Sequence, residues 1–274
     1  MPEPRIISLV PSITELLFAL GLGDRVVGRT GFCIHPADRV AAIPKVGGTK
    51  HLRMGVIRAL APTHVIVNVD ENRREDAEAL AAFVPEVIVT HPLGPADNLA
   101  LYRQLGTIFG VEAAAEALCV AFEAASTAVA RRVAGRVPDQ VLYLIWRDPW
   151  MTVSPDTYIS ATLALVGWRT HPLAATDRYP VVRLEEYAHR IDRVLLSSEP
   201  FHFKARHLAE VRAAVPGATV SLIDGEMCSW YGSRAIAGLH YLADYALGGA
   251  EPPPAGAGTE VAPAPSTAGL GWHP

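Results

Sequence analysis

The stretch RIISLVPSITE, residues 5–15, decides how this chain folds. An apolar strand over 5–10 runs into Pro11 and Ser12, and a helix then continues as LLFALGLG. Ser12 has the side chain of a good N-cap, and Glu15 stands three residues later, where it would complete a capping box. A strand whose carboxyl end leads into a helix N-terminus is the usual ligand-binding arrangement of α/β folds.

Strand and helix patterns alternate along the rest of the chain. Further apolar runs typical of strands occupy 24–30, 64–69, 86–91, 140–146, 193–198 and 219–224. Helical periods fill the intervals, over 53–60, 71–83, 97–109, 156–166, 204–214 and 232–247. Nearly continuous apolar strands that alternate with helices predict parallel sheets covered on both faces.

The segment 111–137 breaks this rhythm, because it favours helix for about seven turns without proline. It is either an ordinary long surface helix or a rigid spine between two lobes. The second interpretation predicts an N-terminal α/β lobe over 1–110, a backbone helix over 111–137 and a C-terminal α/β lobe over 138–248. The remaining 249–274 is rich in Pro, Gly and Ala, and we expect a disordered tail there.

Composition excludes several classes of protein. Half of the 274 residues are hydrophobic, and a net charge of −4 without a dense Lys/Arg stripe argues against nucleic-acid binding. No apolar run approaches the length of a membrane span, and the three cysteines lack CxxC spacing. The N-terminus lacks the pattern of a secretory signal, which predicts a cytoplasmic protein, or a periplasmic or extracellular one if a leader has been removed.

Three motifs taken together carry a family resemblance. The strand-to-helix start PSITE, the segment PKVGG (44–48) and the strand LAPTHVIV (60–67) precede the long central helix. Over roughly residues 4–248 the chain resembles the helical-backbone metal receptors, which are the periplasmic-binding-protein family for cobalamin and ferric siderophores. The resemblance implies a class III substrate-binding-protein fold, in which two Rossmann-like lobes joined by a long rigid helix close only slightly on a ligand in their cleft.

The resemblance also implies a partner and a ligand. Family members that dock to an ABC permease carry an exposed glutamate on each lobe. Glu71, Glu75 or Glu78 could serve in the first lobe, whereas the second lobe has Ser229 where the acid is expected. The implied ligand is cobalamin or another corrinoid, with haem second.

Candidate binding residues are those that follow the strands, because ligands of α/β folds gather at the carboxyl ends of strands. The loop WRDPWM (146–151) could present two flat indole faces to a planar macrocycle, or it could hold one core tryptophan and one lid. The stretch DGEMCSWYGSR (224–234) offers soft, aromatic and cationic contacts, or it is a structured turn. The predicted ligand-binding residues are Ser12, Lys50, Asp70, Trp146, Arg147, Trp150, Phe201, Glu226, Met227, Trp230, Tyr231 and Arg234.

A metal ligand is predicted from the CxH pair of Cys33 and His35, with His202 as the alternative from the opposite lobe. His35 is the preferred axial ligand. Spacing alone does not show that these side chains converge, and a hydrogen-bonded surface histidine is the competing interpretation.

The sequence thus predicts a non-catalytic protein that holds a metal tetrapyrrole or metal chelate in the interlobe cleft, with a corrinoid ahead of haem or a siderophore. The alternative is a cytoplasmic enzyme of the same fold with Cys33, His35, Asp70 or Glu226 as acid–base groups or metal ligands. No GxSxG, Walker, GxGxxG or HExxH motif supports catalysis. A third possibility is a secreted receptor.

Overall fold

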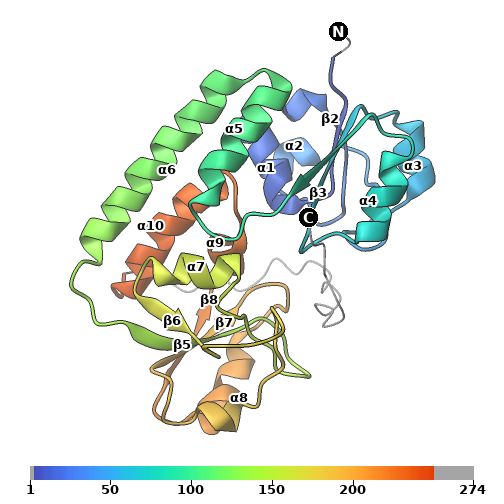
Figure 1. Ribbon diagram of the computed structural model, residues 1–274. Helices are drawn as coiled ribbons and strands as arrows, with labels where there is room; N and C mark the ends of the chain where they lie inside the picture. The colour runs from blue at the N-terminus through green and yellow to red at the C-terminus, as the bar shows by residue number, and fades with distance from the viewer. Residues whose placement is uncertain (1–2, 250–274) are drawn as a thin grey trace.

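Two four-stranded parallel sheets form the centres of two lobes (Figure 1). The computed structural model describes residues 3–249. In the first lobe the strand order is β2-β1-β3-β4, and in the second it is β6-β5-β7-β8. The two sheets therefore repeat one topology, because β1 corresponds to β5 and β3 corresponds to β7.

The first lobe contains β1 (Ile6–Ser8), α1 (Pro11–Ala19), η1 (Gly23–Arg25), β2 (Val26–Arg29), α2 (Ala37–Val40), α3 (Met54–Ala59), β3 (His64–Asn68), α4 (Arg74–Ala81), β4 (Glu86–Thr90) and α5 (Asp97–Phe109). Helix α6 (Glu112–Arg132) leads to the second lobe. That lobe contains β5 (Asp139–Leu144), α7 (Tyr158–Ala164), β6 (Trp168–Thr170), η2 (Leu184–Tyr187), β7 (Arg193–Ser197), α8 (Ala205–Ala214), β8 (Thr219–Ile223), α9 (Gly225–Ser229) and α10 (Arg234–Ala246).

The predicted two-lobed parallel α/β fold is confirmed, and the seven predicted strands are all present. Strand β6 was not predicted, because its three residues are too few to show a pattern. It pairs with β5 and closes the edge of the second sheet. The predicted tail over 249–274 lies outside the described residues, apart from Gly249.

The predicted capping box at the start of α1 is wrong. Val10 is the N-cap and Pro11 occupies the first turn, so Ser12 lies inside the helix. The Ser12 hydroxyl has no hydrogen-bond partner within residues 3–249. Glu15 instead accepts two hydrogen bonds of 2.8 Å from the Arg234 guanidinium, 219 residues later in the chain. A tertiary ion pair therefore replaced the local contact that the sequence pattern favours.

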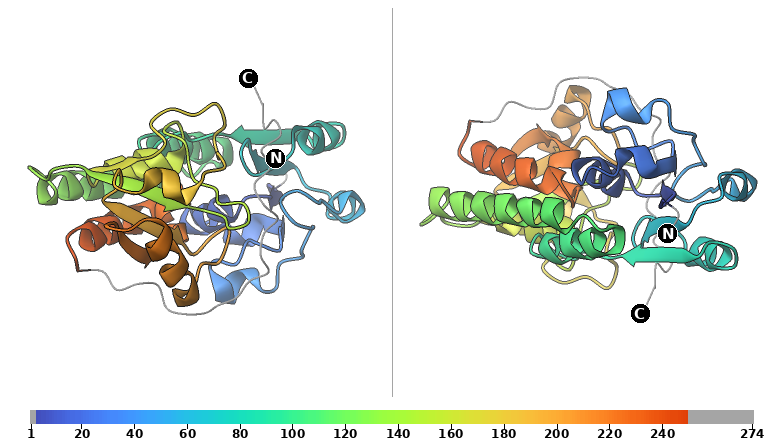
Figure 2. Two further views of the ribbon diagram at one scale, coloured as in Figure 1. Left: turned by 90° about the horizontal axis from the view of Figure 1, so that it is seen from below. Right: turned by 90° about the horizontal axis from the view of Figure 1, so that it is seen from above.

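Helix α6 runs along one side of both lobes, with α5 and α10 packed against it (Figure 2). Its inner face buries Ala115, Cys119, Phe122 and Val129. By length and composition it is the one helix within residues 3–249 that could cross a membrane, but its buried face belongs to the core. That core is continuous from α1 of the first lobe to β5 and α10.

Candidate functional site

A cleft of about 310 Å³ lies between the lobes, at the carboxyl ends of β1, β3, β5 and β7. Six predicted binding residues line it, and they come from both lobes. They are Ser12, Lys50, Asp70, Glu226, Trp230 and Tyr231. The structure therefore brings these six residues together at one cavity, and their binding of a ligand stays a prediction.

The other six predicted binding residues lie outside this lining, and most have partners elsewhere. Arg147 binds Glu210 through two hydrogen bonds of 3.1 Å. Trp146 packs edge-to-face on Phe201, and Trp150 stacks on Phe203. Arg234 pairs with Glu15 and with Glu226, so it positions the lining residue Glu226 without lining the cavity itself. Met227 lines a small enclosed gap beside α10.

The three predicted metal ligands are not gathered. The Cys33 thiol is fully buried and lies 3.1 Å from the Thr30 hydroxyl. The His35 imidazole pairs with the Glu226 carboxylate at 3.1 Å, and the His202 ring contacts the Ser198 carbonyl oxygen at 3.1 Å. Within residues 3–249 no three His, Cys, Asp or Glu side chains form a metal-binding group. A lone axial ligand such as His35 stays a prediction.

Sequence reasoning left several lining residues out of the predicted site. Glu71 and Glu199 follow β3 and β7, so their places after the strands could have revealed them. Tyr158 and Tyr179 also line the cleft, but neither follows a predicted strand. Only the folded backbone brings these two tyrosines to the cavity.

Glu71 accepts a hydrogen bond of 2.8 Å from the Tyr231 hydroxyl. Glu199 accepts hydrogen bonds from the Ser229 hydroxyl (2.7 Å) and the Trp230 indole N–H (2.8 Å). Burial raises the pKa of Glu71 and of Glu199 to about 7 in spite of these donors. Burial also lowers the pKa of Lys50, the one lysine or arginine among the described residues that line the cavity.

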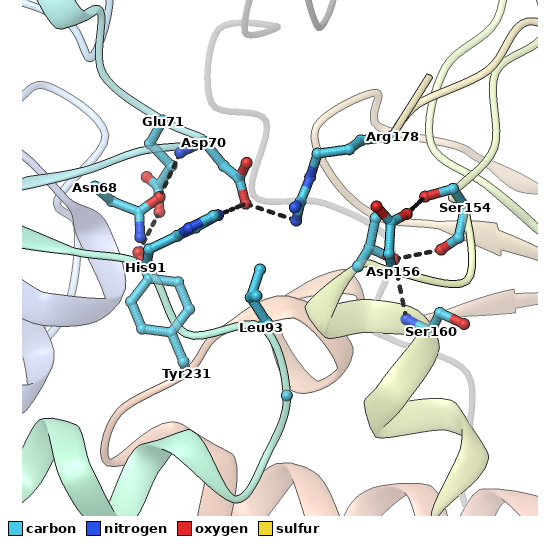
Figure 3. A network of polar contacts seen from close by, with 12 residues as sticks. Asn68, Asp70, Glu71, His91, Leu93, Ser154, Asp156, Ser160, Arg178 and Tyr231 are labelled. Carbon is cyan, nitrogen blue, oxygen red and sulfur yellow. Dashed lines mark hydrogen bonds and ion pairs between the residues drawn. The ribbon is translucent and has the colours of Figure 1, made fainter. Parts of the chain in front are cut away.

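An ion pair at the cleft residue Asp70 joins the two lobes. The Asp70 carboxylate lies between the Arg178 guanidinium of the second lobe, at 3.1 Å, and the His91 imidazole of the first lobe, at 3.7 Å (Figure 3). The segment around Arg178 is held by backbone hydrogen bonds to the loop that follows β5, including Ser154 N–H to the Arg178 carbonyl at 2.8 Å. This segment also carries Tyr179 into the cavity wall.

We expect an Arg178→Gln variant to lose about 1–3 kcal/mol of unfolding free energy, because it leaves the partly buried Asp70 without its cation. The measurement is urea denaturation followed by circular dichroism. Arg183→Gln is the matched control, since Arg183 forms an exposed pair with Glu186 and should change stability by less than about 0.5 kcal/mol. Equal stability of the two variants would contradict the interlobe role of Arg178.

A family model described as periplasmic binding protein matches residues 6–194. This chain belongs to the periplasmic binding protein family. The vitamin B12-binding protein of Vibrio campbellii is 27% identical over 203 residues, which span 72% of this chain and 71% of that protein. The predicted resemblance to the family for cobalamin and siderophores is thereby confirmed.

Solved structures of periplasmic binding proteins share the fold. The periplasmic vitamin B12 binding protein BtuF of Vibrio cholerae superposes with a TM-score of 0.79 at 17% identity, over 90% of this chain and 97% of that one. The periplasmic haem-binding protein RhuT from Roseiflexus sp. RS-1 gives a TM-score of 0.78 at 23% identity, over 91% and 100%. The class III fold predicted from sequence is therefore shown.

Proposed function

We propose that this periplasmic binding protein is a non-catalytic receptor that holds a metal tetrapyrrole or metal chelate in its interlobe cleft, with a corrinoid ahead of haem or a siderophore. The observation that carries the proposal is an aromatic lining contributed by both lobes. Phe32 comes from the first lobe, and Tyr158, Tyr179, Trp230 and Tyr231 come from the second. Aromatic faces suit a planar macrocycle.

The charge of the cleft supports a corrinoid over haem. Four carboxyl groups line it, from Asp70, Glu71, Glu199 and Glu226, against one lysine. Haem carries two carboxylates, which these groups would repel, whereas the corrin ring carries amide side chains that can donate hydrogen bonds to carboxylates. The cavity is near the lower end of ligand-pocket volumes, about 300–1,000 Å³, so a corrinoid would extend beyond it towards solvent.

We further propose a periplasmic location and delivery to an ABC permease. The support is that two structural neighbours are described as periplasmic, and that another, from Listeria monocytogenes EGD-e, is described as an ABC transporter substrate-binding protein. The cytoplasmic location expected from the N-terminal sequence finds no support among these neighbours.

The enzyme alternative has weaker support. Burial raises the pKa of the Cys33 thiol, which makes it a poor nucleophile or metal ligand at neutral pH. Asp70 and Glu226 are each held in an ion pair with an arginine. These contacts suit the wall of a binding site better than a proton-transfer role.

The test is titration with cyanocobalamin and with haemin, followed by visible absorption. We expect cyanocobalamin to bind with a micromolar or lower Kd, and haemin to bind more weakly. Trp230→Phe should weaken cyanocobalamin binding at least tenfold, because it removes the indole face and the donor to Glu199. Failure of both ligands to bind below tens of micromolar would reject the proposal.

A second tryptophan variant tests the loop WRDPWM. Trp146→Phe should leave cyanocobalamin affinity within twofold of the unmodified protein if the loop stays outside the cavity, where Trp146 packs on Phe201. A loss equal to that of Trp230→Phe would place the loop in the binding site.

A further inference from the structure

Two of the cleft carboxyl groups occupy matching places in the two lobes. Glu71 lies three residues after β3, and Glu199 lies two residues after β7. Strands β3 and β7 have the same position in the two sheets. Both side chains line the same cavity, and the negative charge of Glu199 adds to the effect of burial in raising the pKa of Glu71.

One short segment of the second lobe donates hydrogen bonds to both carboxyl groups. Tyr231 donates to Glu71, while Ser229 and Trp230 donate to Glu199. The segment 229–231 therefore holds both carboxyl groups by hydrogen bonds. All three donors are neutral, so none of them balances the negative charge that either carboxyl group carries when it is ionised.

The other two cleft carboxyl groups differ in this respect. Asp70 has Arg178 at 3.1 Å, and Glu226 has Arg234 at 3.0 Å. Among the described residues, no lysine, arginine or histidine nitrogen lies within 4.0 Å of a carboxyl oxygen of Glu71 or Glu199. Lys50 attracts Glu71 only at longer range.

A partly buried carboxylate without a cation is unfavourable for the fold, so its place in a cavity wall indicates a role towards a ligand. We propose that Glu71 and Glu199 form one subsite that accepts hydrogen bonds from amide or ammonium groups of the ligand and rejects ligands whose facing edge carries carboxylates. This inference rests on the proposed receptor function and assigns the chemistry by which the cleft selects its ligand.

The test uses Glu71→Gln and Glu199→Gln, because glutamine keeps an oxygen that can accept from Tyr231, Ser229 and Trp230 and removes only the charge. At pH 8, above the pKa of about 7 of both groups, we expect each variant to bind cyanocobalamin about tenfold more weakly, since hydrogen bonds to charged groups are the stronger ones. Affinity for haemin should stay the same or rise. Glu75→Gln on α4 is the matched control, because it removes one exposed carboxylate away from the cleft lining and should change neither affinity.

A second measurement needs no ligand. At pH 8 the ligand-free Glu71→Gln and Glu199→Gln proteins should have a higher Tm than the unmodified protein, while Glu75→Gln should match it. A lower Tm would overturn the subsite, because it would show that the charges stabilise the fold.

The outcomes separate the two proposals. If the unmodified protein binds cyanocobalamin but both glutamine variants bind it equally well, the subsite is rejected and the receptor function stands. If the unmodified protein binds neither cyanocobalamin nor haemin, and the glutamine variants still have a raised Tm, the proposed tetrapyrrole is rejected. The subsite then stands for another ligand that carries amide or ammonium groups.

Discussion

A Gly238→Ala variant is expected to lose about 3 kcal/mol of unfolding free energy and most of its ligand affinity. A Cβ atom at Gly238 of α10 would lie 2.4 Å from the carbonyl oxygen of Met227 in α9. Because that neighbour is backbone, the added methyl group must move one helix relative to the other. Helix α9 carries Glu226 and leads directly into the segment 229–231, so its displacement also disturbs the cleft wall.

The control is a second glycine-to-alanine change within a helix. Gly55 of α3 is exposed, and a Cβ atom there would meet nothing within 4 Å. Gly55→Ala should therefore stabilise the protein by up to about 1 kcal/mol through helix propensity. Urea denaturation and cyanocobalamin titration of both variants provide the comparison. Unchanged stability of Gly238→Ala would show that α9 and α10 can separate at no free-energy penalty.

The free energy of unfolding of the ligand-free protein is expected to decrease as the pH rises from about 4.5 to about 7, through the contributions of Glu71 and Glu199. Both have a pKa of about 7 in the folded protein, against 4.5 for an ordinary glutamate. Between these values the unfolded chain binds fewer protons than the folded one, so raising the pH favours unfolding. Each carboxyl contributes at most about 3 kcal/mol, and less where cleft water screens it.

Burial is the largest cause of both pKa shifts, and the groups that face the two carboxyls adjust them. Glu71 faces the Tyr231 hydroxyl, Lys50 and the charges of Glu199 and Asp70. Glu199 faces the Ser229 hydroxyl, the Trp230 indole, and the charges of Glu226 and Asp224.

Two histidines have the opposite effect on the free energy of unfolding over part of this pH range. Burial lowers the pKa of His171 and His207 below the ordinary 6.5, so their contribution to stability rises as the pH increases towards 6.5.

The difference in unfolding free energy between the unmodified protein and the Glu71→Gln/Glu199→Gln double variant isolates the contribution of the carboxyl pair. Urea denaturation at half-unit steps from pH 4 to 8 gives both profiles. Parallel profiles would show that the carboxyl pair does not titrate as proposed.

The fold was predictable because each lobe repeats a simple pattern of apolar strands and helices. Strand β6 escaped prediction because three residues carry no period. The capping box at Ser12 failed for another reason. A local pattern shows only that a contact is possible. Glu15 pairs instead with Arg234, which lies near the other end of the described chain.

The site was predictable only in part. The rule that ligands gather at strand ends placed Ser12, Asp70 and Trp230 in the cleft wall. It could not show which way the loop after β5 turns, and Trp146 and Trp150 pack against phenylalanines of their own lobe. Whether a carboxylate has a cation beside it also depends on residues distant in sequence. The sequence alone therefore could not show that, among the described residues, Asp70 is paired with an arginine and that its neighbour Glu71 is not.

The continuous core has a consequence for how the two halves of the chain depend on each other. Helix α10, the last described helix, packs on α1 and α6 as well as on α9, and the Gly232 carbonyl before it accepts a hydrogen bond from Tyr102 of α5. A fragment that ends after α6 would therefore expose the groove that α10 fills. Each lobe of this protein therefore depends on the other half of the polypeptide for part of its buried core.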